Sequence, residues 1–271
     1  MTESLRIALA QCNFVVGDLA ANTDTMLAAV DQAKARGAHL ILFSELSVTG
    51  YPPEDLLLRP SLQTRVEAQI ERLIQASDGI AIVAGFPWCE NDQLFNCAET
   101  WFNGKSLGRY AKQCLPNFQV FDEHRYFTAG DESLVFELLG HKLGLTICED
   151  VWHQHPVDQC VEAGAELLLN LNASPFHMGK HQLRYDVLHD HVTRRGVPIV
   201  YVNQVGGQDE LVFDGGSFAM NATGESVLQL PCYVESSGDL TWDGSQLTAI
   251  DAPAESEFNE LESLYQALVL G

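Results

Sequence analysis

The first part of the chain alternates strand-like apolar runs with amphipathic helical segments. Residues 5–10 alternate large and small side chains as a strand does, whereas residues 39–43 and 80–85 are apolar runs typical of buried strands. Asn22 is predicted to cap the helix between the first two strands, and Ser61 the helix before the third, because both side chains accept hydrogen bonds at helix N-termini. This order predicts strand–helix–strand units.

Hairpin signals appear in the middle of the chain. Asn103-Gly104 separates two strand-like runs and is a dipeptide preferred in type I′ turns. Gly140-His141 is predicted to form the turn of a second hairpin, and residues 221–224 that of a third. Doubly wound parallel folds lack so many hairpins, so we expect an α/β fold with a mixed sheet, or two sheets packed face to face with helices outside.

The last part of the chain adds two helices and two strands and then becomes acidic. Residues 157–163 and 180–195 predict helices, and residues 167–171 and 197–202 predict buried strands. From residue 235 the chain shows little periodicity and is expected to form a peripheral extension.

The C-terminal residues carry apolar side chains at helical spacing. They predict an amphipathic helix with one apolar stripe, formed by Phe258, Leu261, Leu264, Tyr265 and Leu268. We therefore divide the chain into residues 1–234, expected to hold the main fold, and residues 235–271, expected to form the acidic extension and this helix.

Composition narrows the class of protein. The chain has 271 residues, 46% of them hydrophobic, which is enough for one large core. The formal net charge of −22 makes nucleic acid and anionic membranes poor partners, and high solubility is its simplest explanation. No apolar run is long enough to span a membrane and no signal-peptide pattern opens the sequence, so a cytoplasmic location is expected. Seven cysteines at irregular spacing, without a CxxC pair, indicate reduced thiols.

One cysteine lies where a predicted buried strand becomes polar. Cys148 follows the apolar residues 143–147 and precedes Glu149 and Asp150. A strand end can hold a nucleophile at the rim of a sheet, but a free thiol has a pKa of about 8.5 and attacks as the thiolate. It therefore needs an ammonium that lowers this pKa or a carboxylate that takes the proton. Taken alone, such a cysteine is more often a packing residue.

Two charged residues are candidate partners for this thiol. Glu45 follows a buried strand, at the end where α/β folds place functional groups, and Lys112 follows the strand-like residues 107–111. Taken alone, Glu45 is more often a helix cap or a surface carboxylate, and Lys112 a solvated lysine. Only the fold can bring these two residues to Cys148, because their spacing in the sequence carries no such information.

The sequence gives little support for a metal or nucleotide site. His153, His155 and Cys160 are loosely grouped, and His177 and His181 have HxxxH spacing without the glutamate of HExxH. Neither a GxxxxGK[ST] loop nor a GxGxxG segment after a strand occurs. We therefore predict no metal site and no nucleotide site in this chain.

Three segments together resemble a known family. Residues 45–57, 112–127 and 148–152 each begin with one of the three candidate residues. They resemble motifs of the nitrilase (carbon–nitrogen hydrolase) superfamily, whose triad is Glu-Lys-Cys. The strings Tyr-Pro-Pro-Glu-Asp-Leu and Cys-Glu-Asp-Val-Trp narrow the resemblance to the N-terminal glutaminase domain of glutamine-dependent NAD synthetases. It covers nearly the whole chain, but the synthetase domain with its Ser-Gly-Gly loop is absent.

The resemblance implies a fold and a reaction. The fold is a four-layer α-β-β-α sandwich that assembles into homo-oligomers. Cys148 would attack the side-chain amide of L-glutamine, and Glu45 would act as general base and acid. Lys112 and the backbone N–H of Glu149 would hold the oxyanion, and Glu123 would position Lys112. The glutaminase reaction needs no cofactor. The ammonia would serve the ATP-dependent amidation of deamido-NAD, with ATP and Mg expected only in the synthetase domain.

Further residues match substrate-binding positions of that family. Ser174 and Lys180 match its substrate serine and its basic residue, so Lys180 is expected to bind the α-carboxylate of glutamine and Glu149 the α-ammonium. Phe118 stands where the family commonly has tyrosine, so a hydroxyl hydrogen bond is lost while ring packing remains. Phe121 is expected to bind substrate as well. Without the resemblance, Ser174 is more often a turn residue.

Two other functions remain open from the sequence. One is a free-standing nitrilase-type amidase that acts on another small amide. The other is a non-catalytic regulatory subunit whose C-terminal helix docks a synthetase partner, although the complete triad argues against it. A glutaminase domain separated from its synthetase is also expected to be slow or uncoupled.

Overall fold

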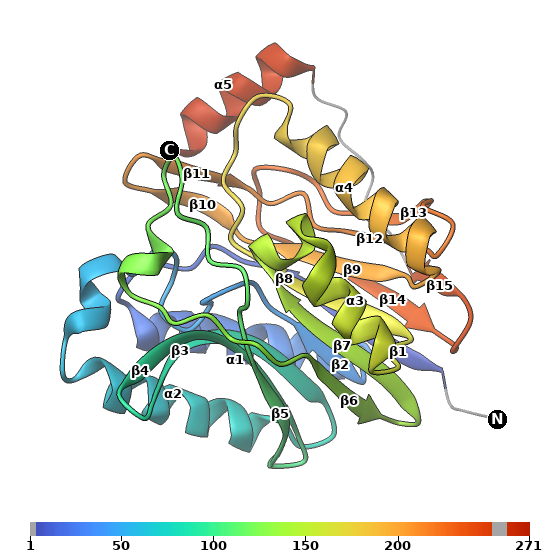
Figure 1. The fold of residues 1–271 in the computed structure, drawn as a ribbon, viewed down its shortest axis with the longest axis horizontal. Coiled ribbons are helices and arrows are strands. Elements are labelled where there is room, and N and C mark those ends of the chain that lie inside the picture. The colour runs from blue at the N-terminus through green and yellow to red at the C-terminus, as the bar shows by residue number, and fades with distance from the viewer. Residues whose placement is uncertain (1–3, 251–258) are drawn as a thin grey trace.

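Two β-sheets pack face to face, and helices cover both outer faces (Figure 1). The computed structural model describes residues 4–250 and 259–271. Within these residues the larger sheet has seven strands in the order β15-β14-β1-β2-β3-β4-β5, and the smaller has six in the order β13-β12-β9-β8-β7-β6. The predicted four-layer α-β-β-α sandwich is therefore confirmed.

Both sheets are parallel at their centres and antiparallel toward their edges. The strands of the larger sheet are β1 (Leu5–Gln11), β2 (Leu40–Leu42), β3 (Ala81–Glu90), β4 (Gln93–Phe102), β5 (Lys105–Ala111), β14 (Ser236–Trp242) and β15 (Leu247–Ile250). Those of the smaller sheet are β6 (Leu134–Leu138), β7 (His141–Ile147), β8 (Leu167–Asn172), β9 (Ile199–Asn203), β12 (Phe218–Met220) and β13 (Ser226–Gln229). A separate hairpin, which the sequence pattern did not predict, is formed by β10 (Val205–Gln208) and β11 (Leu211–Asp214).

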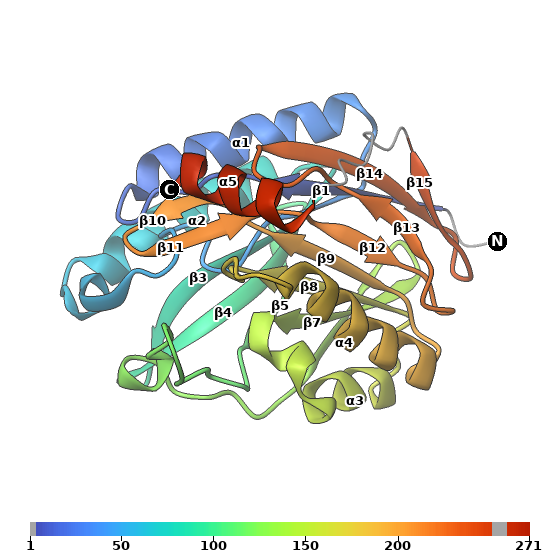
Figure 2. The ribbon, with the colours of Figure 1, turned by 90° about the horizontal axis from the view of Figure 1, so that it is seen from above.

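The helices form the two outer layers (Figure 2). The larger sheet is covered by α1 (Leu19–Ala35) and α2 (Leu62–Ala76), and the smaller by α3 (Gln154–Glu162) and α4 (Lys180–Arg195). Short 3-10 helices are η1 (Glu54–Leu58), η2 (Glu123–Arg125) and η3 (Cys148–Trp152). No helix among the described residues is both long and apolar enough to cross a membrane.

The alternation of side chains along β1 builds two of the layers. Leu5, Ile7 and Leu9 belong to the apolar cluster between the two sheets, whereas Ala8 and Ala10 belong to the cluster that joins the larger sheet to α1 and α2. A third cluster joins the smaller sheet to α3 and α4. The pattern of large and small residues in the sequence thus assigns each face of the strand to its layer.

Two local predictions from the sequence are wrong. Asn22 does not cap α1, because the helix begins at Leu19 with Asp18 as its cap. The buried Asn22 side-chain amide instead bonds the backbone N–H and carbonyl of Val15. The turn between β6 and β7 is Leu139-Gly140, with φ angles of +51° and +84°, rather than Gly140-His141. His141 is buried as the first residue of β7.

The prediction that residues 236–250 belong to a peripheral extension is also wrong. They form β14 and β15, and β14 pairs with the full length of β1 in the larger sheet. The buried Asp239 of β14 also binds Arg6 at 2.7 Å and Arg36 at 3.0 Å. The mostly small and polar sequence of β14, Ser-Ser-Gly-Asp-Leu-Thr-Trp, hid the strand from the pattern.

The predicted C-terminal helix is present as α5 (Glu260–Leu270), capped by Asn259. Its apolar stripe is exposed, with 77% of Leu261, 64% of Tyr265 and 74% of Leu268 accessible to solvent. Phe258, which the sequence assigned to the same stripe, lies outside the described residues.

Candidate active site

Cys148 lies at a sharp bend between β7 and η3. β7 is held between β6 and β8, so its end is fixed within the smaller sheet. Cys148 has a φ of +43°, a left-handed conformation that residues other than glycine seldom adopt and that is concentrated at functional sites. The residue is 5% exposed. Two residues later, the buried Asp150 accepts the backbone N–H of Ile147 at 2.9 Å and closes the bend.

Glu45 is held in a buried loop that follows β2. The loop packs closely against β3, where Val48 donates its N–H to the Gly85 carbonyl at 3.1 Å. A Cβ atom on Gly85 would lie 2.4 Å from the Leu46 nitrogen, so only glycine allows this approach. Glu45 is completely buried there. The close packing fixes the backbone from which the carboxylate extends.

Lys112 joins Glu45 to Glu123. Its ammonium donates to Glu45 Oε1 at 2.7 Å and to the two carboxylate oxygens of Glu123 at 2.8 and 2.9 Å. All three side chains are buried. The fold therefore brings two of the predicted triad residues into direct contact, and Glu123 contacts Lys112 as the resemblance implied.

Three further groups, none of them predicted from the sequence, fix the two carboxylates. Asn96 of β4 donates to Glu45 Oε1 at 2.7 Å, and the backbone N–H of Ala173 donates to Glu45 Oε2 at 3.0 Å. The Tyr51 hydroxyl donates to Glu123 Oε1 at 2.9 Å. Tyr51 belongs to one of the family strings, so a signal for it existed, whereas Asn96 lies in a strand without any motif.

Burial and charge set the protonation of this cluster. Burial alone lowers the pKa of the Lys112 ammonium, but Glu123 and Glu45 outweigh it, so this pKa is raised well above its ordinary value and the lysine stays charged. Burial raises the pKa of Glu123 to about 7, although Lys112 and the hydrogen bond from Tyr51 act in the opposite direction. Near neutral pH, Glu123 is therefore poised between its two protonation states.

The Cys148 thiol is neutral at rest. Burial raises its pKa well above the ordinary value, Glu45 adds to this effect, and Lys112 opposes it. The lowering by a nearby ammonium that the sequence suggested is present, but desolvation exceeds it. A neutral thiol has to lose its proton as it attacks, and a neighbouring carboxylate is the group suited to take it.

Lys180 and Glu149 carry charges near the thiol. The Lys180 ammonium lies 3.9 Å from the centre of the Trp152 ring. Burial lowers the pKa of Lys180, while Cys148 and Glu149 raise it, which places all three groups in one neighbourhood. Glu149 also pairs with His153 at 3.3 Å, and burial raises the pKa of Glu149. Trp152, the last residue of the third family segment, is a contact that the sequence did not predict.

Ser174 is tied to a buried ion pair. Arg184 donates to the Ser174 hydroxyl oxygen at 3.2 Å and to its carbonyl at 2.8 Å. The same guanidinium binds both oxygens of Asp214 at 2.9 Å. The serine hydroxyl oxygen is therefore held in place by Arg184. Arg184 and Asp214 belong to no motif, so the sequence carried no signal for this ion pair.

Phe118 and Phe121 lie on the segment between Lys112 and η2. Their rings meet edge to face with centroids 5.7 Å apart, Phe118 is 51% exposed and Phe121 is partly buried. This aromatic pair offers an apolar wall on the same segment that carries Lys112 and Glu123.

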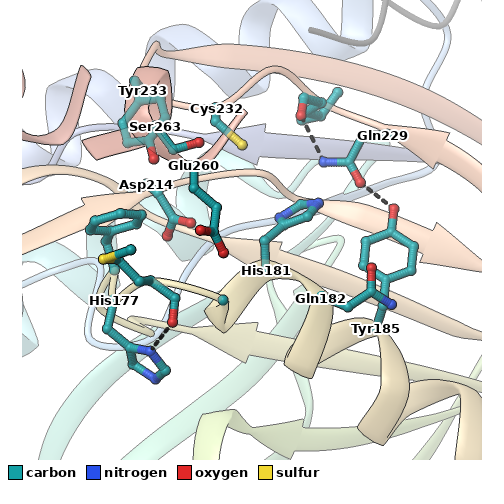
Figure 3. A pocket seen from close by; sticks show the side chains of 14 residues that line it. His177, His181, Gln182, Tyr185, Asp214, Gln229, Cys232, Tyr233, Glu260 and Ser263 are labelled. Carbon is teal, nitrogen blue, oxygen red and sulfur yellow. Dashed lines mark hydrogen bonds between the residues drawn. The ribbon is translucent and has the colours of Figure 1, made fainter. Parts of the chain in front are cut away.

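A cavity of about 490 Å³ lies beside α4 and α5 (Figure 3). Its wall includes Asp214, His181, Cys232 and Glu260, and it includes no residue of the predicted triad. The Asp214 charge is already neutralised by Arg184. Among the described residues, no group of three or more His, Cys, Asp or Glu side chains is arranged to hold a metal ion.

Comparisons with known sequences point to one family. The family model described as carbon-nitrogen hydrolase matches residues 6–237. The glutamine-dependent NAD(+) synthetase of Acinetobacter baylyi is 40% identical over 268 residues, which cover 99% of this chain and 50% of that protein. The chain therefore spans about half the length of this curated relative.

Comparisons with solved structures point to the same family. A glutamine-dependent NAD+ synthetase from Acinetobacter baumannii, in complex with adenosine diphosphate, superposes with a TM-score of 0.94 at 41% identity, covering 99% of this chain and 51% of that one. The second is an amidase mutant from Nesterenkonia sp. that carries the acetamide moiety of fluoroacetamide added covalently at its active site cysteine. It superposes with a TM-score of 0.82 at 27% identity, covering 89% of this chain and 90% of that one.

Proposed function

The chain belongs to the carbon-nitrogen hydrolase family, and we propose that it hydrolyses the side-chain amide of L-glutamine through a thioester on Cys148. The observation that carries this proposal is the contact of the Lys112 ammonium with Glu45, in a buried cluster whose charges also act on the thiol. The covalent adduct at the active site cysteine of the Nesterenkonia amidase supports the same role for a cysteine here.

The first half of the reaction forms the thioester. Cys148 Sγ attacks the amide carbon while Glu45 takes the thiol proton. The carbonyl oxygen becomes an oxyanion, which Lys112 and the backbone N–H of Glu149 stabilise, an effect worth about 2.7–4 kcal/mol per donor. When the oxyanion collapses, the C–N bond breaks and Glu45 gives its proton to the leaving nitrogen. Ammonia leaves and the glutamyl thioester remains.

The second half regenerates the enzyme. Glu45, again ionised, takes a proton from water, and the hydroxide oxygen attacks the thioester carbon. The C–S bond breaks, glutamate leaves, and the proton on Glu45 returns to Cys148. The hydrogen bonds from Asn96 and Ala173 keep the Glu45 carboxylate in one place through all four proton transfers.

Charges near the thiol support glutamine as the substrate. Lys180 supplies a cation for the α-carboxylate, and Glu149 supplies an anion for the α-ammonium. Phe118 and Phe121 supply an apolar wall for the side-chain methylenes. Ser174, which matches the substrate serine of the family, is held in place by Arg184.

The function of a longer protein belongs to the same proposal. The relatives named above are synthetases of twice the matched length, so we propose that the ammonia serves the amidation of deamido-NAD by a synthetase domain that binds ATP and Mg. The glutaminase reaction itself uses no cofactor. Homo-oligomers and a cytoplasmic location, both predicted from the sequence, remain part of this proposal.

A second candidate is a free-standing amidase for another small amide. The match to almost the full length of the Nesterenkonia amidase favours it, but the lower identity and TM-score of that match place it second. The charged side chains Lys180 and Glu149 have no use in binding a small neutral amide, whereas an amino acid uses both.

Steady-state ammonia release tests the proposal. The purified chain is assayed with glutamine, asparagine and propionamide, alone and with a synthetase domain added. We expect kcat/KM to be highest for glutamine, and Cys148→Ala to abolish turnover while a Cys89→Ala control retains it. Retained turnover in Cys148→Ala refutes the assignment of Cys148 as the nucleophile. A higher kcat/KM for propionamide than for glutamine refutes the glutaminase proposal and favours an amidase for small amides.

A further inference from the structure

One buried carboxylate connects the segments that carry the thiol and the lysine. Asp150 accepts the backbone N–H of Ile147 at 2.9 Å, and it also accepts those of Gln113 at 3.1 Å and Cys114 at 2.8 Å. The Tyr110 hydroxyl gives a fourth bond at 2.8 Å. Three of the four donors are therefore backbone groups, and they come from both segments.

These donors are neighbours of the two catalytic candidates in the chain. Ile147 directly precedes Cys148 at the end of β7, in the smaller sheet. Gln113 directly follows Lys112, which comes just after β5, the edge strand of the larger sheet. Apolar packing between sheets is not directional, so it fixes their relative position less sharply than hydrogen bonds do. Asp150 supplies directional bonds across the sheets at the site itself.

Burial of the Asp150 carboxylate costs free energy. Asp150 is completely buried and no arginine or lysine pairs with it among the ion pairs of the described residues. Burial raises its pKa to about 6, while the bonds from Ile147 and Cys114, the charge of Lys112 and the Tyr110 hydroxyl act in the opposite direction. An asparagine offers a single acceptor oxygen and cannot serve all these donors at once. A carboxylate is costly to bury, so the presence of Asp150 here indicates that its directional hydrogen bonds matter to the site.

We propose that Asp150 is a positioning residue that holds the Cys148 thiol in register with the Lys112 ammonium. This inference rests on the proposed function for the roles of Cys148 and Lys112. It adds a residue that touches neither substrate nor reacting atoms and acts through the two backbones. A shift of about 1 Å between thiol and ammonium is enough to cost about 10²-fold in rate.

The kinetic test compares Asp150→Asn with a matched buried carboxylate. Asp239→Asn removes a similar buried charge from β14, away from the site, and controls for lost stability. For Asp150→Asn we expect kcat for glutamine to fall about 10²-fold, with KM within about twofold because the substrate contacts remain. Asp239→Asn is expected to keep the wild-type kcat. An unchanged kcat in folded Asp150→Asn, or an equal loss in both variants, overturns the proposal.

A second readout does not need glutamine. Alkylation of Cys148 by iodoacetamide is followed by peptide mass spectrometry across pH, with the exposed Cys89 as the internal standard. If Asp150 holds Lys112 near the thiol, Asp150→Asn moves the Cys148 labelling profile to higher pH, because the lowering effect of the ammonium is lost. Loss of a nearby negative charge alone moves the profile to lower pH. An unchanged or lowered profile therefore contradicts positioning, whether or not the chain turns over glutamine.

A milder variant covers the case in which Asp150→Asn does not fold. Tyr110→Phe removes one of the four hydrogen bonds and leaves the three backbone bonds. We expect a smaller fall in kcat, about threefold to tenfold for a bond worth roughly 1 kcal/mol, with an unchanged KM. If Tyr110→Phe is the only folded variant, an unchanged kcat overturns the proposal.

Discussion

The Lys112 ammonium lies 2.7 Å from Glu45, and both side chains are completely buried. The pair carries a large desolvation cost, which is offset only while both partners and Glu123 are present. Removing one partner therefore affects stability as well as chemistry.

Lys112→Met is expected to destabilise the protein by about 3–5 kcal/mol, because it leaves two carboxylates buried without their cation. Urea unfolding at pH 7 measures the loss. The double variant Lys112→Met with Glu45→Gln should recover part of it, since one of the stranded charges is then removed. A loss below about 1 kcal/mol in the single variant would mean that the pair is not a structural unit.

Tyr51→Phe is expected to move the acid limb of the kcat/KM profile to higher pH. The tyrosine hydroxyl stabilises the ionised form of Glu123, whose pKa is about 7, so its removal raises that pKa further. A larger fraction of Glu123 is then protonated at pH 7, and its hold on Lys112 weakens. A pH–rate series from 5 to 9 tests this, and an acid limb that stays in place or moves to lower pH contradicts it.

Asp150→Asn is expected to flatten the pH dependence of stability. The folded-state pKa of about 6 exceeds the ordinary value of 3.8, so the native state binds a proton that the unfolded state releases. The stability from this group is present in full below about pH 4 and is lost as pH rises to about 6, by roughly 3 kcal/mol at 1.4 kcal/mol per pKa unit. Urea unfolding at pH 4.5 and 7 in both proteins measures the difference in slope. An equal slope would show that Asp150 does not titrate in this window.

Lys180→Gln is expected to raise KM for glutamine about 10-fold to 100-fold, since a hydrogen bond to a charged group is worth about 1.5–3 kcal/mol. The kcat should change far less, because Lys180 is assigned to the α-carboxylate and not to the reacting amide. Propionamide, which has no α-carboxylate, serves as the control substrate and should show no change. Equal losses on both substrates would place Lys180 in the chemical step.

A chain that ends at Val234 is expected to unfold or aggregate, whereas one that ends at Ile250 keeps its fold. The shorter chain lacks β14 and so exposes the edge of β1 and leaves Arg6 and Arg36 without Asp239. Circular dichroism and thermal melting of the two truncated chains compare them. A stable shorter chain would restore the domain boundary at residue 234 that the sequence predicted.

The predictions that succeeded rest on local patterns. The Asn103-Gly104 turn, the helix over residues 180–195 and the buried runs of the parallel strands are where the sequence placed them, because turn chemistry and side-chain period act over a few residues. The position of Cys148 at a strand end was equally local. Errors arose where tertiary contacts decided the outcome. The Asn22 side chain bonds the backbone of Val15 instead of capping a helix, and Asp239 can be buried in a strand only because two arginines pair with its charge.

The sequence by itself determined the buried parallel strands, the thiol at the end of one of them and, through three short motifs, the family. The tertiary structure alone decided that Glu45, Lys112 and Glu123 form one buried cluster, that burial keeps the Cys148 thiol neutral, and that Asp150 bonds to both segments. The physical reason is that desolvation and hydrogen bonding depend on distances between groups far apart in the chain. Such distances exist only after the two sheets have packed.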